Sequence, residues 1–252
     1  MAARAGTAQL SDTAGPEPLV SNNKNCMAFR MSRAARVRAL PFLAFLLLLA
    51  LRGALPPEGA SGIDPRWIYG LTVLIVGGML LAWRKEYGEL ARQNAPDSRQ
   101  LLWAAAAGLG VFALWIHLDA PWMTLGEATA SFRPLGADGS IDWLLVAVRW
   151  IGATLVVPVM EELFWRSFLM RWIQRPDFVG VDPARVGLRA VIVSTFLFVL
   201  VHPLWLAAAL AGLAYAWLYI RTGNLWTSVI AHAVTNGALG IWVVYTRQWQ
   251  FW

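Results

Sequence analysis

Residues 141–173 read IDWLLVAVRWIGATLVVPVMEELFWRSFLMRWI, a stretch long and apolar enough to cross a membrane. Its apolar residues are continuous rather than alternating, so they do not match a half-buried strand. In hydrocarbon, a single segment of this kind satisfies its backbone only as a helix. The stretch therefore predicts a transmembrane helix, and this helix is interrupted by two adjacent carboxylates, Glu161 and Glu162, and by Arg166.

Six further apolar runs accompany this helix in the 252-residue chain. The chain is 58% hydrophobic and 14% charged, with a mean hydropathy of +0.52, whereas about a quarter of the residues in soluble domains are charged. The sequence therefore predicts an all-α, polytopic membrane helix bundle of about seven transmembrane helices. The further runs are Ala39–Leu51, Trp67–Trp83, Leu101–Leu118, Leu188–Val201, Leu204–Ile220 and Leu225–Tyr245.

The N-terminal part of the chain divides at about residue 30. Residues 1–30 are polar and lack periodicity, which predicts a disordered tail ahead of a membrane domain over residues 31–252. The first apolar run is short enough to be the core of a signal peptide. When it is extended through Leu55, it also fits a retained transmembrane helix, and we favour this interpretation.

The basic residues predict an orientation rather than a nucleic-acid partner. The net charge of +6 is concentrated in alternate loops between the apolar runs, so the positive-inside rule places the N-terminus in the cytoplasm. Such loops suit contact with the lipid bilayer, and we expect no nucleic-acid binding. The single cysteine, Cys26, excludes an intramolecular disulfide and a cysteine metal cluster.

Three of the apolar runs carry polar side chains that need partners. Glu162 and Arg166 are four residues apart on a helix and can form an ion pair, while Glu161 points about 100° away and stays available. His202 ends one run, and His232 and Asn236 share a face of the last run. Each element alone also fits a bland structural role, as a surface ion pair, a structural histidine or an interhelical hydrogen bond.

Together these groups predict one buried polar site, because buried polar groups must find partners. A carboxylate and an imidazole can hold and deprotonate a water molecule, and a second histidine with an amide can stabilise an oxyanion. A covalent nucleophile is not favoured, because Cys26 lies in the tail and no serine of these runs has a base beside it in the sequence. The chemistry that fits is hydrolysis.

The same residues resemble a known family, the CAAX prenyl protease and bacteriocin-processing intramembrane peptidases. The family pattern appears in order as Glu161-Glu162-x-x-x-Arg166, Phe198-x-x-x-His202 and His232-x-x-x-Asn236, within a core at about residues 142–246. The resemblance implies an endopeptidase that cleaves a membrane-associated or envelope-targeted protein. It also implies that Glu161 and His202 activate water, that His232 and Asn236 form the oxyanion site, and that Glu162, Arg166 and Phe198 support them.

Shorter stretches resemble a bacterial subgroup of CAAX prenyl protease-related proteins that are associated with exosortase systems. These stretches are residues 164–169 (FWRSFL), 175–178 (RPDF) and 249–252 (WQFW). The resemblance implies a bacterial inner-membrane protein and exosortase-system proteins as partners. We expect no metal; the alternative is a zinc ion held by Glu161, His202 and His232, with water as the fourth ligand.

Two functions of other classes stay open at this point. One is a non-catalytic membrane scaffold or immunity-type partner that keeps the protease fold. The other is a transporter with a proton relay, although the chain shows no internal repeat. One geometric conflict also remains. Glu161 is expected about 30 Å from the outer end of its helix and His202 about 20 Å from the cytoplasmic end of its own, and these depths do not coincide.

Overall fold

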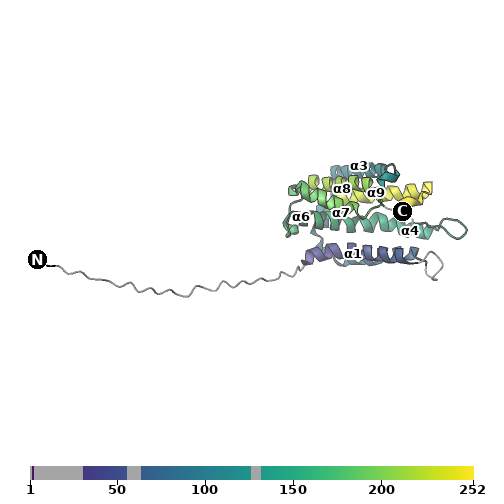
Figure 1. The fold of residues 1–252 in the computed structure, drawn as a ribbon, viewed down its shortest axis with the longest axis horizontal. Helices are drawn as coiled ribbons and strands as arrows, with labels where there is room; N and C mark the ends of the chain where they lie inside the picture. The colour runs from purple at the N-terminus through teal and green to yellow at the C-terminus, as the bar shows by residue number, and fades with distance from the viewer. Residues whose placement is uncertain (1, 3–30, 56–63, 126–131) are drawn as a thin grey trace. The chain divides into compact units, whose positions relative to one another are not determined.

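A computed structural model of the chain describes residue 2 and residues 31–55, 64–125 and 132–252, which form helices joined by short connections (Figure 1). The chain divides into two units, Met1–Met31 and Ser32–Trp252, and the second contains all the helices of the described residues. The predicted tail lies outside the described residues, apart from Ala2. The helices are α1 Arg33–Ala54, α2 Arg66–Ala82, α3 Ser98–Trp115, α4 Trp143–Ile151, α5 Val157–Glu162, α6 Arg171–Gln174, α7 Leu188–Val199, α8 Trp205–Thr222 and α9 Leu225–Thr246.

Helices α4, α5 and α6 form one continuous helical rod, Trp143–Gln174, with a π-helical segment at each junction. The first segment, Gly152–Val156, directly precedes Pro158. Proline lacks a backbone N–H and its ring clashes with the carbonyl four residues earlier, so a widened turn at this place has a clear cause. The second segment, Leu163–Met170, directly follows the carboxylates Glu161 and Glu162. The two carboxylates therefore lie between two widened turns, a feature frequent at functional sites.

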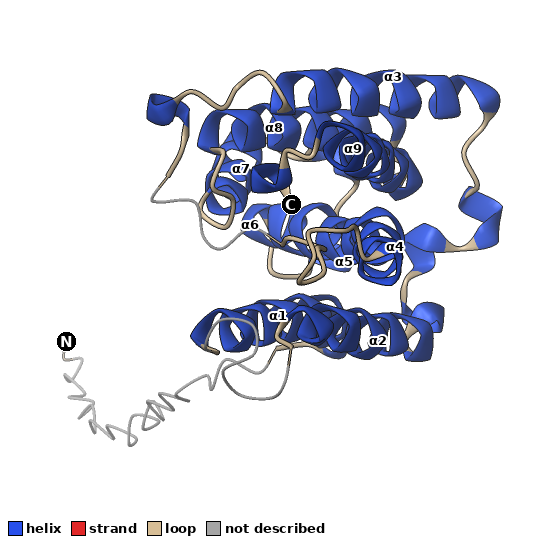
Figure 2. Ribbon diagram, turned by 90° about the vertical axis from the view of Figure 1, so that its right-hand side faces the viewer, coloured by secondary structure: helices blue, strands red, loops and turns tan. Residues whose placement is uncertain are grey.

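The helices pack in layers around this rod (Figure 2). Helices α1 and α2 pack against each other and form one layer. Helices α3, α8 and α9 pack together on the opposite side of the rod, with α7 beside α8. The rod lies between the layers and contacts α1, α7 and α9, so its polar residues are surrounded by helices from distant parts of the sequence.

The predicted all-α fold is confirmed, and the helix ends follow the apolar runs closely. Among the described residues, three helices are long and apolar enough to cross a membrane by length and composition: α1, the rod and α9. Helices α2 and α7 are apolar but shorter. The first apolar run is part of the 22-residue helix α1, and its Phe42 stacks on Phe164 of the rod at 4.1 Å between ring centroids. Local capping also agrees with the sequence, since Asp97, Asp142 and Asn224 each accept a hydrogen bond from the first turn of a helix.

Gly108 allows α3 and α9 to approach closely. A Cβ atom at this position would lie 2.4 Å from the carbonyl oxygen of Ala231 and 2.8 Å from Cβ of Val234. We expect Gly108→Ala to destabilise the protein by about 1–3 kcal/mol, because the backbone of α9 must move to relieve the overlap. Thermal unfolding of the purified protein in detergent measures the effect.

Gly110 provides a matched control on the same helix, because a Cβ atom there has no neighbour within 4 Å. Gly110→Ala should leave stability unchanged or raise it slightly, since alanine favours helix more than glycine does. Equal effects of the two substitutions would show that the contact between α3 and α9 does not limit the packing.

A buried ionic network joins the connection between α2 and α3 to the bundle. Glu89 forms ion pairs with Arg38 at 2.6 Å and with Arg171 at 2.5 Å, and it accepts a hydrogen bond from Ser167. Arg38 and Arg171 are 3% and 4% exposed. These two arginines therefore do not belong to the exposed basic residues of the loops, because their guanidinium groups neutralise a buried carboxylate.

The charge of Glu89 should make stability depend on pH. Burial raises the pKa of Glu89, but Arg38, Ser167 and Arg171 together lower it below its usual value of 4.5. The stabilisation is therefore complete above about pH 4.5 and is lost as the pH falls through the lower pKa of the folded state. We expect Glu89→Gln to destabilise the protein by about 2 kcal/mol at pH 7 and by much less at pH 3.

Unfolding measured at both pH values tests this dependence. Glu86→Gln is the control, because Glu86 pairs with Arg33 on the exposed surface, where ion pairs contribute little. The free energy of unfolding is compared between the Glu89→Gln variant and the unsubstituted protein. If the difference is the same at pH 7 and at pH 3, the role of the carboxylate charge is contradicted.

Candidate active site

Glu162 lies at the centre of a buried ion-pair cluster. Its side chain is fully buried, and its Oε1 atom accepts from Arg166 Nη1 at 3.1 Å and from His232 Nδ1 at 3.0 Å. The predicted i,i+4 ion pair between Glu162 and Arg166 is therefore present. The contact with His232 joins the rod to α9 and fixes the orientation of the imidazole ring, because the Nδ1 proton faces a carboxylate.

Arg166 is held by groups from three further positions. Its Nη2 atom donates to the carbonyl oxygen of Gly212 at 3.2 Å, and its guanidinium lies 4.7 Å from the ring centroid of Phe198 and 5.4 Å from that of Tyr215. Stacking over aromatic faces stabilises a guanidinium in an apolar environment. Phe198 therefore contacts the cluster directly, through cation–π packing, and Arg166 links the rod to α7 and α8.

Glu161 differs from its neighbour in forming no ion pair among the described residues. Its side chain is 6% exposed, and its Oε2 atom is buried without a hydrogen-bond partner among the described residues. An unpartnered buried carboxylate oxygen is costly, and it is found where a ligand, water or reaction uses it. Glu162 also has an unpartnered Oε2 atom, but its Oε1 atom is held by Arg166 and His232, whereas the Glu161 carboxylate forms no ion pair among the described residues.

His202 lies just after α7 and reaches the same region. Its Nδ1 atom is 2.7 Å from the carbonyl oxygen of Phe198, which can only accept, so Nδ1 carries the proton and Nε2 keeps a lone pair. The half-buried ring packs on Phe198, with 4.2 Å between centroids, and edge-on against Trp115 at 5.9 Å. It interacts electrostatically with Glu161, His232 and Arg166. The structure thus brings the first two polar motifs together.

His232 and Asn236 lie one turn apart on α9 but have different partners. The ring of His232 stacks on Tyr215 at 5.0 Å, while its Nδ1 faces Glu162. The Asn236 amide donates from Nδ2 to the carbonyl oxygen of Ala153 at 2.9 Å, inside the first π-helical segment. Asn236 is therefore beside the rod but is not hydrogen-bonded to the ionic cluster, and one of its two N–H donors is already used.

The conflict in depth between Glu161 and His202 disappears when both are measured from the same end. The N-terminus of α7 adjoins the C-terminus of the rod, where the backbone N–H of Gly187 donates to Gln174 Oε1 at 3.0 Å. Glu161 lies 13 residues before Gln174, and His202 lies 14 residues after Leu188. Both are therefore about 20 Å from this shared end. The rod continues well past Glu161, so the carboxylates lie within a long helix rather than at its end.

The carboxylate and imidazoles do not form a zinc site in this arrangement. Within residues 31–55, 64–125 and 132–252, no three His, Cys, Asp or Glu side chains are grouped so that they could hold a metal ion. Glu161, His202 and His232 are the set that the sequence suggested, and they are not grouped closely enough to hold a metal ion in this arrangement. No step of the mechanism is assigned to a metal.

Two features of the site had no signal in the sequence. Tyr215 stacks on His232 and donates its hydroxyl proton to Thr235 at 2.8 Å, yet it is an ordinary aromatic residue of an apolar run. The π-helical segments on either side of Glu161 and Glu162 also follow from no local pattern except Pro158. The position of Tyr215, four residues before Tyr219 in the sequence, gave no indication that Tyr215 contacts His232.

Comparison with known proteins adds one finding to this geometry. No curated protein and no solved structure matches the chain. A family model does match, over less than half of the chain, and the matched segment contains all three polar motifs. Residues 143–238 match the family described as "Type II CAAX prenyl endopeptidase Rce1-like", so this segment is similar to the CAAX-type intramembrane peptidases.

Proposed function

We propose that the protein is an intramembrane endopeptidase that hydrolyses a peptide bond of a membrane-associated or envelope-targeted protein. The observation that carries this proposal is the carboxylate of Glu161, which is buried in an apolar rod with Oε2 unpartnered. The neighbouring Glu162 holds His232, and His202 packs on Phe198, which also contacts Arg166. The match of residues 143–238 to an endopeptidase family supports a protease of the membrane.

In this proposal Glu161 and His202 activate the attacking water. The unprotonated Nε2 of His202 accepts a hydrogen bond from the water, and Glu161 Oε2 takes its proton as the hydroxide attacks the peptide carbonyl. The proton then passes to the amine of the leaving group, so that the base is restored. Burial strengthens these electrostatic interactions, because the surroundings compete little for hydrogen bonds.

His232 and Asn236 stabilise the tetrahedral oxyanion. Glu162 holds Nδ1 of His232, which leaves Nε2 directed away from the carboxylate and able to donate when the ring is protonated. Asn236 supplies the N–H that Ala153 does not use. Arg166 and Phe198 keep Glu162 in place, and they act as supporting residues rather than as participants in the chemistry.

The basic end of the domain supports the orientation and location that we propose. The loops that carry the exposed basic residues also lie together at one end of the bundle, around residues 84–97, 175–187 and 221–224. By the positive-inside rule this end is cytoplasmic, as is the N-terminus, in a bacterial inner membrane. We also propose exosortase-system proteins as partners, because residues 164–169, 175–178 and 249–252 resemble the CAAX prenyl protease-related proteins that are associated with such systems.

Mapping of the N-termini and C-termini of membrane proteins tests the proposal in cells. Membrane fractions are compared from cells that contain the chain, cells that lack it, and cells in which it is restored. We expect at least one envelope protein to show a new N-terminus or a shortened C-terminus near a membrane span only when the chain is present. Identical termini in all three samples, with the protein well expressed, would contradict proteolysis.

A further inference from the structure

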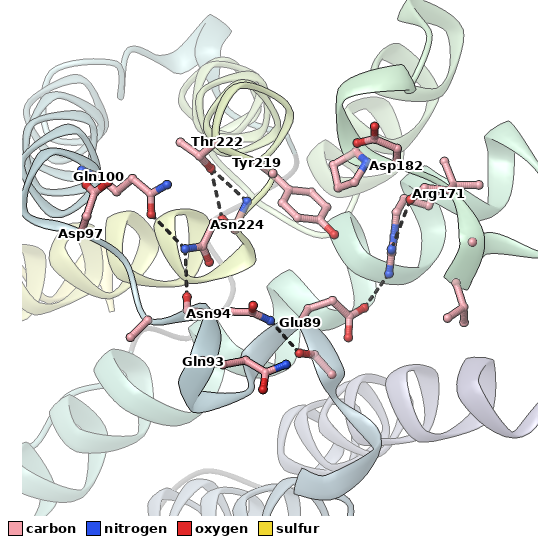
Figure 3. Close-up of a pocket in the computed structure, with 17 residues that line it drawn as sticks. Glu89, Gln93, Asn94, Asp97, Gln100, Arg171, Asp182, Tyr219, Thr222 and Asn224 are labelled. Carbon is pink, nitrogen blue, oxygen red and sulfur yellow. Dashed lines mark hydrogen bonds and ion pairs between the residues drawn. The ribbon is translucent and has the colours of Figure 1, made fainter.

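A polar cavity of about 700 Å³ lies at the basic end of the domain, separate from the candidate active site (Figure 3). Four segments line it: the connection between α2 and α3, the end of the rod at Arg171, residues 179–183, and the turn between α8 and α9. Its volume is in the range of ligand-binding sites. None of the predicted catalytic residues lines it, so the cavity is a feature that hydrolysis alone does not explain.

Tyr219 points into this cavity with an unsatisfied hydroxyl (Figure 3). The side chain is only 1% exposed, and its hydroxyl makes no hydrogen bond among the described residues. Hydroxyl groups of buried side chains normally have a partner. This hydroxyl meets the open space of the cavity, where a ligand can supply one. The hydroxyl is therefore an independent sign that the cavity binds something.

The charged groups of the cavity that can still bind a ligand are carboxylates, which carry negative charge and accept hydrogen bonds. Arg171 already donates four hydrogen bonds, to Glu89, Ser167 and Val181, and its charge is paired with Glu89. Two aspartates remain: Asp97 forms no ion pair among the described residues, and Asp182 has only an exposed contact with Arg185 at 3.9 Å. Each uses its Oδ1 atom to accept a hydrogen bond from a local backbone N–H. Oδ2 of Asp97 has no partner among the described residues, and Oδ2 of Asp182 has only the long contact with Arg185.

We infer that the cavity binds a Lys or Arg side chain of the polypeptide that is cleaved, an inference that rests on the proposed function. Membrane proteins carry Lys and Arg within about 15–20 residues of the cytoplasmic ends of their spans, and an ammonium or guanidinium group complements Asp97, Asp182 and the Tyr219 oxygen. The cavity therefore recognises the basic segment that flanks the span of a substrate.

The spacing along the rod locates this side chain relative to the cleaved bond. Arg171 lies ten residues after Glu161, a distance of about 15 Å along a helix. An extended peptide covers about 3.3–3.6 Å per residue, so the basic residue lies roughly four residues from the scissile bond. Substrates with a basic residue at this distance should be preferred over those with one elsewhere.

Peptide binding to the purified full-length chain in detergent tests the assignment. The probe is a fluorescently labelled acetyl-Gly-Ser-Lys-Ser-Gly amide, compared by anisotropy with the same peptide carrying norleucine in place of lysine. We expect the lysine peptide to bind about tenfold more tightly, because norleucine keeps the stem and removes the charge. Tyr219→Phe and Asp182→Asn should each weaken lysine-peptide binding roughly fivefold without changing thermal unfolding.

Asp177→Asn is the matched control, because Asp177 is an exposed aspartate of the same loop that does not line the cavity. It makes the same change in net charge as Asp182→Asn and should leave binding unchanged. Equal binding of the two peptides, or equal losses in the two Asp→Asn variants, would overturn the assignment. Loss of peptide binding when phosphatidylethanolamine is added would overturn it too, by showing that a lipid amine occupies the cavity.

The binding measurement needs no turnover, so the two proposals can fail separately. The Glu161→Gln variant should bind the lysine peptide as tightly as the unsubstituted protein does. Binding without any proteolysis would contradict the proposed function and leave the cavity assigned. Proteolysis without lysine-selective binding would contradict the cavity assignment and leave the proposed function in place.

Discussion

Replacing Glu161 by Gln is expected to reduce substrate cleavage about a thousandfold, the effect of removing a general base. Gln has nearly the same shape but cannot take the proton of the attacking water. The folded protein should tolerate the change, because Oε2 of Glu161 has no hydrogen-bond partner to lose. Processing of the substrate in cells, measured at equal amounts of protein in the membrane, gives the result.

Glu86→Gln makes the same chemical change in an exposed ion pair with Arg33 and should leave cleavage unaffected. Comparable cleavage by the Glu161→Gln variant and by the unsubstituted protein would remove Glu161 from the mechanism. It would favour the alternative function, a scaffold or immunity-type partner that keeps the fold without turnover.

Replacing Glu162 by Leu is expected to destabilise the protein by about 3–5 kcal/mol, the cost of leaving a buried charge without its partner. Glu162 accepts from both Arg166 and His232, so the change leaves the Arg166 guanidinium uncompensated in an apolar environment. Unfolding by heat or denaturant in detergent measures the loss. Cleavage should fall as well, because the ring of His232 loses the group that orients it.

The double variant Glu162→Leu with Arg166→Met separates these effects. Removal of both charges eliminates the uncompensated guanidinium, so stability should recover in large part, while activity should stay low because His232 still lacks its partner. If the Glu162→Leu variant is as stable as the unsubstituted protein, the cluster does not hold the rod, α8 and α9 together.

The helices could be predicted well because the apolar composition of a membrane span is a local property of the sequence. The run Trp67–Trp83 became α2 at Arg66–Ala82, and Leu225–Tyr245 became α9 at Leu225–Thr246. The fate of Arg38 and Arg171 could not be predicted in the same way. Their common partner, Glu89, lies far away in the sequence, and a basic residue near a helix end looks the same whether it faces lipid headgroups or a buried carboxylate.

The candidate site shows the same division between local and distant contacts. The pair Glu162–Arg166 follows from helical spacing and is present at 3.1 Å. The contact of His232 with Glu162 spans 70 residues, and sequence spacing predicted convergence of the motifs but not which glutamate the histidine meets. The depths of Glu161 and His202 seemed to conflict because they were measured from opposite ends of their helices, and the contact of Gly187 with Gln174, which joins the two helices at one end, could not be predicted from local sequence.

The central claim is that this buried cluster hydrolyses a peptide bond, and purified components test it most directly. The unsubstituted chain and its Glu161→Gln variant are reconstituted separately in liposomes with one membrane-anchored protein whose terminus changes in cells. Cleavage at the cellular site is followed by mass spectrometry. The account predicts the product with the unsubstituted chain and none with the variant. The same product from both, or from neither, would contradict it.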